Sequence, residues 1–524
     1  MKSGGGIPGA LIVWTGSYVF FLLTLVTNFS ASHDSINYLN GIVNGTELFH
    51  QHHLLYHFTA YLWLNALRPV FGAVQDHYLI EAYTALWGSS TLALVYNFFR
   101  RRFALPASLS VAGVALIGFS YGMWFYSVNI EVYAPPIFSI VACLYLIAKK
   151  DFSQRDVLAI AALHCFAILF HQVNILFTPI LLYVIYVNRA SLNVKKSVVQ
   201  YFLTGLIVVG GAYWTIGWII EGHDHFGEWV GWLEGYTVNH GYWQPLSMRT
   251  PIRALTGFGH AFVGGHFVFR LPGVSESFQQ SFNDHGLQDE IFLAARLSPG
   301  LALSLAVLTM IVAIVLLLQV IRFVRKYPAI SAGHGRTVRP ILLCITIYSV
   351  FFLFWMPEIL EFWILQSVLV WVLLVGTLPV TRQFSFPLWR LAWPMAGMFF
   401  LINFFGSILW LQRIENDWYF SRVKILQPLA VKGDLIYCGE GWILKDFLRR
   451  YTPARVIAPD DPEFNDRTAD SLVAVTLAAK KKVYVFPSAG SEAGGSHDLA
   501  KSLSRFAVRT RPVGAGTDSV FVIE

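Results

Sequence analysis

Apolar stretches without charge recur along the first 411 residues and alternate with shorter polar segments. A helix of about 20 apolar residues is long enough to cross a hydrocarbon core of about 30 Å. The pattern therefore predicts an α-helical polytopic membrane protein. The two shortest runs fit either complete spans or a broken, re-entrant pair. About eleven spans are expected, near residues 11–29, 77–99, 104–128, 132–149, 156–170, 173–188, 198–220, 299–321, 340–356, 358–380 and 391–411.

Basic residues are distributed unevenly between the two sides of these spans. With a cytoplasmic N-terminus, the inner segments carry 17 Lys and Arg residues and the outer segments before the tail carry 5. Cytoplasmic loops of membrane proteins are enriched in Lys and Arg. We therefore predict a cytoplasmic N-terminus and an extracytoplasmic C-terminus. A bacterial inner membrane is the expected location, with the endoplasmic reticulum as the alternative.

Two long polar segments within the predicted membrane domain, residues 1–411, are expected outside the membrane. The first, 30–76, contains an amphipathic stretch from Leu48 to Leu67 that is predicted to lie as a helix in the interface. The second, 221–298, is rich in Trp, His and Gly and carries basic side chains. Such a composition suits a loop at the headgroup level, within reach of a lipid phosphate.

The tail, residues 412–524, has the composition of a soluble domain. The stretches DLIYCG, ARVIA, KVYVFP and SVFVIE read as short buried strands. The stretches WILKDFLRRY, TADSLVAVTLAAKK and HDLAKSLSRF read as helices. Alternation of the two predicts a small α/β domain. Its glycines lack the strand, turn and helix context of a phosphate-binding loop, so we interpret it as an accessory domain.

Composition supports this organisation. The 524 residues are 55% hydrophobic and only 13% charged, with a mean hydropathy of +0.54, which excludes an ordinary soluble protein. The net charge of +7 is explained by the basic inner segments, so we expect no nucleic-acid partner. The four cysteines form neither a disulfide framework nor a zinc spacing.

Two carboxylates are candidates for chemistry at the outer face. Asp34 follows the first predicted span, where low dielectric raises the affinity of a carboxylate for protons. It is a candidate acid or base, although a cap for a helix that starts near Ser35 is the alternative. Glu131, in the turn NIEVYAPP, is expected on the same face, either in a shared cleft with Asp34 or in a wet turn. Two such groups are able to share a proton, a hydroxyl acceptor or a divalent cation.

Histidines are concentrated in the stretch FHQHHLLYH, residues 49–57. On a helix, His50, His53 and His57 would line one face. Three interpretations stay open: contact with a phosphate through imidazole N–H groups, a metal site of Glu47, His50 and His53, or the wet side of an amphipathic helix. The same interpretations stay open for His171, which lies between the two short predicted spans.

The stretch MPEILEFW, residues 356–363, places Glu358 and Glu361 one helical turn apart at the outer end of a predicted span. The positive end of a helix dipole favours negative side chains in the first turn. We therefore expect the two glutamates to cap a helix N-terminus.

These features resemble the GT-C superfamily of membrane glycosyltransferases, in particular protein O-mannosyltransferases and lipid A aminoarabinose transferases. The resemblance covers the layout of roughly the first 400 residues. It rests on Asp34 with Tyr38 in DSINYLNGIVNG, on FHQHHLLYH, on Glu131 in EVYAPP, on HQVNILFTP from His171, and on MPEILEFWI.

The resemblance implies a GT-C type fold with the small α/β domain appended. It also implies a sugar donor carried on a polyprenyl monophosphate and transfer to an acceptor hydroxyl on the extracytoplasmic face. Inverting displacement at the anomeric carbon is expected, with Asp34 as the base and Glu131 as a second acidic group for the acceptor or a metal. The acceptor would be a protein, a lipid or a glycan, and a divalent metal ion is the one cofactor to consider.

The same resemblance suggests where the donor binds. His52, His53 and His171 are expected near the donor phosphate. Arg249 and Arg253, in the second outer segment, are expected near the lipid carrier. Phosphate leaves with developing negative charge, which hydrogen-bond donors and cations stabilise.

A multi-span transporter and a non-catalytic lipid-binding subunit of envelope assembly are the alternatives. Transporters carry charged or helix-breaking residues near the middle of the membrane, whereas here the acidic and histidine residues cluster at the outer ends of spans. This placement favours an interfacial enzyme. The assembly subunit differs from the enzyme in that Asp34 and Glu131 would be dispensable.

Overall fold

The computed structural model describes residues 6–235, 242–281, 287–379, 391–439, 441–459, 461, 466–486, 510–513 and 520–523. They divide into two compact units. The helical unit comprises Met1–Val26, Gly41–Ser275 and Leu297–Trp410. The tail unit comprises Thr27–Asn40, Glu276–Arg296 and Leu411–Glu524, so it combines the tail with two segments that precede it by more than a hundred residues in the chain.

The helical unit consists of helices joined by short turns. Its principal helices are α1 (Gly6–Leu22), α3 (Tyr56–Phe71), α4 (Asp76–Arg102), α5 (Ala107–Gly118), α6 (Tyr121–Phe125), α7 (Ala134–Ile147), α8 (Gln154–Phe170), α9 (Thr178–Val187), α10 (Val194–Gly205), α11 (Gly211–Trp214), α12 (Phe226–Glu234), α13 (Thr250–His260), α14 (Val274–Ser281, to Ser275 in this unit), α16 (Pro299–Phe352), α17 (Ile364–Gly376), α18 (Ala392–Asn403) and α19 (Leu409–Leu411, to Trp410 in this unit).

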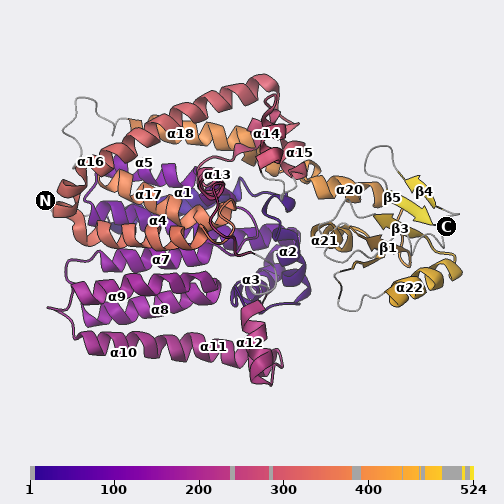
Figure 1. Cartoon of the computed structure of the whole chain (residues 1–524), viewed down its shortest axis with the longest axis horizontal. Helices are drawn as coiled ribbons and strands as arrows, with labels where there is room; N and C mark the ends of the chain where they lie inside the picture. The colour runs from indigo at the N-terminus through magenta and orange to yellow at the C-terminus, as the bar shows by residue number, and fades with distance from the viewer. Residues whose placement is uncertain are drawn as a thin grey trace. The chain divides into compact units, whose positions relative to one another are not determined.

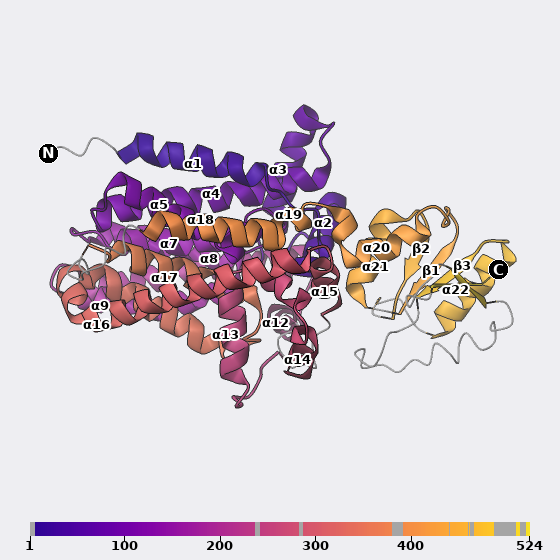
Figure 2. The same cartoon turned by 90° about the horizontal axis from the view of Figure 1, so that it is seen from above.

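Most of these helices lie side by side along one direction (Figures 1 and 2). α1 packs on α4, α4 on α7, α7 on α8, and α8 on α10, while α5 contacts α4, α17 and α18. Close approach is possible where α5 carries Gly113, because a Cβ there would lie 2.6 Å from the Phe99 ring of α4 and 2.8 Å from Val375 of α17. The sequence thus permits three helices to meet at this point.

Three described helices are long and apolar enough to cross a membrane by length and composition: Val194–Ile220, Pro299–Phe352 and Ala392–Leu411. Shorter apolar helices lie at other predicted spans, including Pro8–Leu22 and Ala134–Ile147. The chain is therefore an integral membrane protein. The count of eleven spans stays a prediction, since apolar runs such as 104–128 are divided between two helices.

The predicted inner segment between 321 and 340 is not a loop. Two helices within α16 meet there at a kink, where the backbone of His334 is non-helical with φ −128° and ψ 17°. The short spans near 156–170 and 173–188 correspond to α8 and α9, which are joined by the extended residue His171 and the 3-10 turn Gln172–Phe177. Whether they form a re-entrant pair stays a prediction.

The predicted interfacial helix from Leu48 to Leu67 is wrong in its first part. Residues 51–55 form turns, and α3 begins only at Tyr56. His50 and His53 face one another in an isolated β-bridge, so helical spacing does not explain their proximity. An interval of three residues is typical of one face of a helix, but a compact turn also brings residues three positions apart into contact.

The tail unit contains a five-stranded sheet in the order β2-β1-β3-β5-β4. The strands β1, β2 and β3 are parallel, whereas β5 is antiparallel to both β3 and β4. The strand and helix bounds are β1 (Leu435–Cys438), β2 (Arg455–Ile457), β3 (Val483–Phe486), β4 (Thr510–Val513), β5 (Val520–Ile523), α2 (Ser35–Asn44, to Asn40 in this unit), α15 (Gln288–Ala294), α20 (Trp418–Leu426), α21 (Trp442–Tyr451) and α22 (Asp466–Ala478).

Apolar side chains explain why these strands are buried. Leu435 and Tyr437 of β1 and Val483 of β3 pack with Val473 of α22 in one cluster. Every residue of β1 and β3 is buried, as expected for parallel strands that are covered on both faces. Strand β4 was not predicted from the sequence, and the predicted helix HDLAKSLSRF lies outside the described residues.

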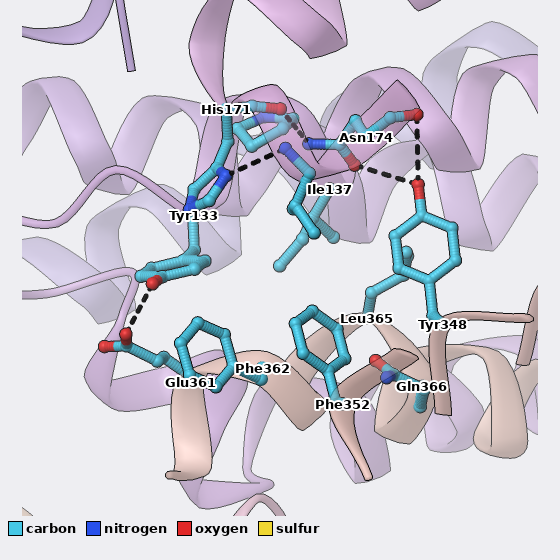
Figure 3. Close-up of a pocket in the computed structure, with 12 residues that line it drawn as sticks. Tyr133, Ile137, His171, Asn174, Tyr348, Phe352, Glu361, Phe362, Leu365 and Gln366 are labelled. Atoms are coloured by element: carbon cyan, nitrogen blue, oxygen red, sulfur yellow. Dashed lines mark hydrogen bonds between the residues drawn. The ribbon is translucent and has the colours of Figure 1, made fainter. Parts of the chain in front are cut away.

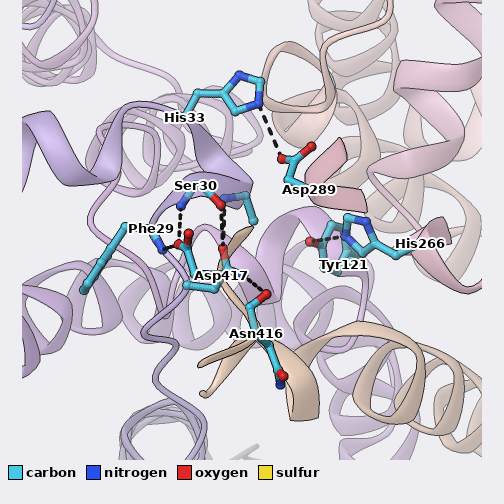
Figure 4. Close-up of polar contacts among 10 residues, drawn as sticks. Phe29, Ser30, His33, Tyr121, His266, Asp289, Asn416 and Asp417 are labelled. Carbon is cyan, nitrogen blue, oxygen red and sulfur yellow. Dashed lines mark hydrogen bonds and ion pairs between the residues drawn. The ribbon is translucent and has the colours of Figure 1, made fainter. Parts of the chain in front are cut away.

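A buried carboxylate joins the tail to the segment that carries Asp34 (Figure 4). Asp417 is 0% exposed, and its Oδ2 accepts hydrogen bonds from the backbone N–H groups of Phe29 and Ser30, each at 3.0 Å. Its Oδ1 accepts from the N–H of Phe420 at 3.0 Å and so caps α20. Burial raises the pKa of Asp417 to about 6, although these hydrogen bonds oppose the rise.

The same segment has further polar ties to the tail. The Asn28 side-chain amide donates to the Asn416 carbonyl at 3.2 Å. In α2, Asn37 donates to the Asp446 carboxylate at 3.2 Å, and Asn40 donates to the Asp446 carbonyl at 3.1 Å. Asp446 belongs to α21, so two hydrogen bonds tie α2 to α21.

Replacing Asp417 is expected to destabilise the protein. Asp417→Ala removes a helix cap and leaves two buried N–H groups without an acceptor, which together cost about 3 kcal/mol of unfolding free energy. Chemical unfolding in detergent measures the change. Glu415→Ala, at an exposed neighbouring carboxylate, serves as the control and should change stability by no more than about 0.5 kcal/mol. Equal effects of the two variants would contradict the structural role of Asp417.

Candidate functional site

Asp34 lies directly before α2 in the tail unit. The Tyr38 hydroxyl, one helical turn later, donates to Asp34 Oδ2 at 3.2 Å. Burial raises the pKa of Asp34, while His33 and the Tyr38 hydrogen bond lower it. A carboxylate with a raised pKa is a stronger base than an exposed one. The pairing with Tyr38, which the sequence motif contains, holds the carboxylate in place.

The residue before Asp34 has an unusual backbone. His33 has φ 64° and ψ −51°, and the Asp34 N–H donates to the Ser32 carbonyl at 2.8 Å, which defines a γ-turn of the strained, positive-φ form. The His33 Nε2 lies 3.8 Å from Asp289 Oδ2 of α15 (Figure 4). Strain of this kind costs about 1–3 kcal/mol and is common beside functional groups. The backbone conformation of His33 sets the direction of the chain at Asp34.

The histidines of the first outer segment meet in the helical unit. The rings of His50 and His53 are stacked with centroids 4.1 Å apart, and those of His53 and His57 are 5.4 Å apart. His171 adds a fourth ring at 6.5 Å from His53. The His52 ring lies 5.4 Å from that of His50, and His52 Nδ1 is hydrogen-bonded to Gln172 Oε1 at 3.1 Å. The structure thus brings His171 together with His50 and His53, which lie more than 100 residues earlier in the stretch FHQHHLLYH.

These imidazoles are held in the neutral state. Burial lowers the pKa of His50 and of His171 to about 3 and that of His57 to about 4, and neighbouring histidines contribute for His50 and His171. Burial also lowers the pKa of His53 well below its usual value. A neutral imidazole donates only one N–H hydrogen bond. The cluster therefore presents uncharged donors rather than positive charge.

The predicted metal site is not supported. Within the described part of the chain, no group of three or more His, Cys, Asp or Glu side chains is arranged to hold a metal ion. The backbone carbonyl of Glu47 accepts from His57 Nδ1 at 2.8 Å. The stacked His50 and His53 rings pack face to face rather than converging on a common point.

Glu131 lies in the helical unit, between α6 and α7, and is 0% exposed. It is therefore not in a wet turn. Burial raises the pKa of the neighbouring Tyr56 hydroxyl, and the Glu131 carboxylate adds to the rise. Tyr56 also shares a 2.9 Å hydrogen bond with Thr84 of α4. Asp34 and Glu131 belong to different units, and a shared cleft between them stays a prediction.

Glu361 was expected to cap a helix, but its carboxylate has other partners. Tyr133 donates to Oε1 at 2.6 Å (Figure 3), and Tyr126 donates to Oε2 at 3.2 Å. Glu361 does lie in the first turn of a 3-10 helix, Leu360–Trp363, without forming a side-chain cap. The Tyr133 ring is 5.2 Å from that of His171. Two tyrosines thus connect this glutamate with the histidine cluster.

The two arginines of the second outer segment differ in environment. Arg253 Nε lies 3.5 Å from Glu358 Oε2, and both side chains are largely buried. Arg253 Nη1 also donates to Gln244 Oε1 at 2.5 Å. Glu358 is therefore an ion-pair partner rather than a helix cap. Arg249 is exposed and lies just before α13.

A pocket in the helical unit lies beside the histidine cluster (Figure 3). It is lined by Tyr133, Pro136, Ile137, His171, Val173, Asn174, Tyr348, Phe352, Glu361, Phe362, Leu365 and Gln366. Tyr348 donates to Asn174 Oδ1 at 3.1 Å, and the Asn174 amide donates to the His171 carbonyl at 2.9 Å. The sequence analysis missed Tyr133 and Gln366. Tyr133 lies inside the motif EVYAPP, but Gln366 has no local signal, since a single glutamine in an apolar span is unremarkable.

Acid is expected to destabilise the protein through the histidine cluster. The unfolded histidines titrate near pH 6.5, whereas those of the folded protein do so near 3 to 4. The unfolded state thus binds more protons between these values, and stability falls as the pH drops below about 6.5. At pH 5 each buried histidine accounts for on the order of 2 kcal/mol. Unfolding midpoints between pH 5 and 7.5 should be less pH-dependent in His50→Gln, but not in the exposed control His225→Gln. An unchanged pH dependence in His50→Gln would refute the assignment.

Glycine and alanine at position 33 are expected to differ in stability. Both remove the imidazole, but only glycine adopts a positive φ without strain, so His33→Gly should be about 1 kcal/mol more stable than His33→Ala. Chemical unfolding of both purified variants measures the difference. At Glu228, an exposed position in α12, the order should reverse because glycine weakens a helix. The same order at both positions would argue against strain at His33.

The chain is similar to known proteins both in sequence, over part of its length, and in fold. A family model described as the protein O-mannosyl-transferase TMEM260 N-terminal domain matches residues 48–194, which include the histidine cluster and Glu131. The structure of ArnT from Cupriavidus metallidurans bound to undecaprenyl phosphate superposes with a TM-score of 0.55 at 12% identity, over 98% of this chain and 96% of that chain.

The apo structure of the same ArnT gives a TM-score of 0.47 at 11% identity, over 98% of both chains. No curated protein sequence matches the chain significantly. The resemblance inferred from sequence motifs is thus confirmed by a family model over part of the chain and by the fold over nearly all of it. The chain resembles the GT-C type of membrane glycosyltransferase in its fold and, over residues 48–194, the protein O-mannosyltransferases in its sequence.

Proposed function

We propose that the protein is a glycosyltransferase that moves a sugar from a polyprenyl-monophosphate carrier to an acceptor hydroxyl. The observation that carries the proposal is the family match over residues 48–194, because it covers the buried Glu131 and the histidine cluster. The ArnT structure of similar fold holds undecaprenyl phosphate, which supports a carrier of this chemical class.

In this proposal Asp34 is the base that removes the proton of the acceptor hydroxyl. The oxygen then attacks the anomeric carbon from the side opposite the phosphate, and the configuration inverts. The raised pKa of Asp34 supports this role, since a stronger base receives the proton more readily. Glu131 is the second acidic group and would position the acceptor. Its buried carboxylate oxygens are able to accept hydrogen bonds from a hydroxyl group.

His52, His53 and His171 are proposed to bind the donor phosphate. Neutral His53 and His171 would each donate an N–H hydrogen bond to a phosphate oxygen. The N–H of neutral His52 is directed at Gln172 Oε1, but an arriving anion favours protonation of a nearby imidazole, which would give His52 a second N–H for the phosphate. Charge that develops on the departing phosphate would be stabilised in this way. Exposed Arg249 would attract the anionic carrier, whereas Arg253 is engaged with Glu358. The described residues do not fit a metal ion, and no step is assigned to one.

The reaction is proposed to take place on the extracytoplasmic face of a bacterial inner membrane, with the N-terminus inside and the C-terminus outside. The excess of basic residues in the predicted inner segments supports this orientation. A protein, lipid or glycan hydroxyl would serve as the acceptor.

Replacement of the proposed base should abolish transfer. The purified protein in liposomes is supplied with radiolabelled polyprenyl-phosphate sugars and an envelope extract as acceptor. Asp34→Asn keeps the shape of the side chain but removes its basicity, so the rate should fall by at least about 100-fold. Incorporation of label into the acceptor fraction measures the rate.

The exposed Asp151→Asn is the matched control and should retain the rate of the wild type. Unfolding midpoints establish that both variants are folded. Equal rates in folded Asp34→Asn and in the wild type would refute the assignment of the base. A wild type that transfers no sugar from any such donor would refute the proposed function itself.

A further inference from the structure

The pocket beside His171 is lined by a buried side-chain amide, that of Gln366, which forms no hydrogen bond with the described residues. Gln366, in the first turn of α17, is 0% exposed, and neither its Nε2 nor its Oε1 has a hydrogen-bond partner among the described residues. An amide that is buried without a partner costs about 1–3 kcal/mol. It lines the pocket together with Tyr348 and Phe352 (Figure 3). A ligand with a hydrogen-bonding group would recover this cost.

The walls of the pocket restrict the chemistry of that ligand. Phe352, Phe362 and Leu365 are apolar, whereas Asn174 and Glu361 are polar. None of the described lining residues is a lysine or an arginine, so the pocket offers no cation to an anionic group. The Glu361 carboxylate, which already accepts from two tyrosines, repels a phosphate and attracts hydroxyl or amino donors.

An isoprenoid chain does not suit the site either. It would fill the apolar part but has no atom that bonds to the Gln366 amide, which would stay buried and unpaired. A sugar ring satisfies both requirements. Its C–H face packs on aromatic side chains such as Phe352 and Phe362, and its hydroxyl groups donate to and accept from an amide.

The position of the pocket agrees with this assignment. His171, a proposed ligand of the donor phosphate, lines one side of it, and the Tyr133 ring lies 5.2 Å from the His171 ring. Building on the proposed function, we infer that this pocket binds the sugar of the lipid-linked donor and that Gln366 determines which sugar is accepted through hydrogen bonds to a ring substituent. Gln366 is thus a specificity-determining residue, distinct from the groups that bind the carrier phosphate.

The test compares the binding of a carrier with and without its sugar. Purified full-length protein in detergent is titrated with undecaprenyl phosphate and with undecaprenyl phosphate that carries mannose, glucose, galactose or 4-amino-4-deoxyarabinose. For the wild type, at least one sugar-bearing lipid should bind more tightly than the bare carrier. In Gln366→Leu this advantage should shrink about tenfold while the affinity for the bare carrier stays unchanged.

Controls separate recognition from stability. Gln366→Leu removes an unpaired buried amide, so the apo protein should unfold at the same or a higher temperature. If leucine prevents folding, Gln366→Met tests the same loss with a more flexible side chain. Gln319→Leu makes the matched change at another buried glutamine, in α16, which does not line the pocket and should leave all affinities unchanged.

The outcomes distinguish this inference from the proposed function. An unchanged sugar advantage in Gln366→Leu overturns the inference, and so does an equal loss of affinity for the bare carrier, which would indicate a lipid pocket or a structural role. A wild type that binds the bare carrier but gains nothing from any sugar overturns it as well. A wild type that binds neither the bare carrier nor any sugar-bearing carrier refutes the proposed function, and the inference that rests on it falls as well.

Discussion

The tail unit depends on one buried carboxylate. Asp417 caps the first helix of the tail with one oxygen and accepts from the backbone of Phe29 and Ser30 with the other. Because buried N–H groups require acceptors, the segment that leads to Asp34 is fixed by a residue almost 400 positions later in the chain. The strained turn at His33 follows immediately, so the direction of the proposed base is determined by this tie and the turn together.

The helical unit also buries polar groups. The histidine cluster is buried and neutral, Glu131 is fully buried, and the amide of Gln366 is unpaired in a pocket. An amide that is buried without a partner, such as that of Gln366, reduces the stability of the protein without ligand. Such costs are typical of sites that bind or transform a ligand, because the ligand supplies the missing interactions. This explains why the pocket and the histidines adjoin.

Part of this site was accessible from the sequence, and the reason is local. Asp34 and Tyr38 are one helical turn apart, so their contact follows from helix geometry. The grouping of His50 and His53 was predicted for the wrong reason, since a turn rather than a helix brings them together. Glu361 does lie in the first turn of a helix, as predicted, but it forms no side-chain cap because distant tyrosine hydroxyls donate to its carboxylate. Contacts between remote segments leave no mark on local periodicity.

The sequence by itself determined the membrane character of the chain and the four predicted strands that the structure contains in the tail, because the length and periodicity of apolar runs depend on neighbours within a few residues. Only the tertiary structure decided that α8 and α9 present His171 to His53, that α15 supplies Asp289 to His33, and that α17 places Gln366 in a pocket. These pairs are separated by 100 residues or more, or lie on different helices. Their proximity is set by helix packing and by the need of buried polar groups for partners.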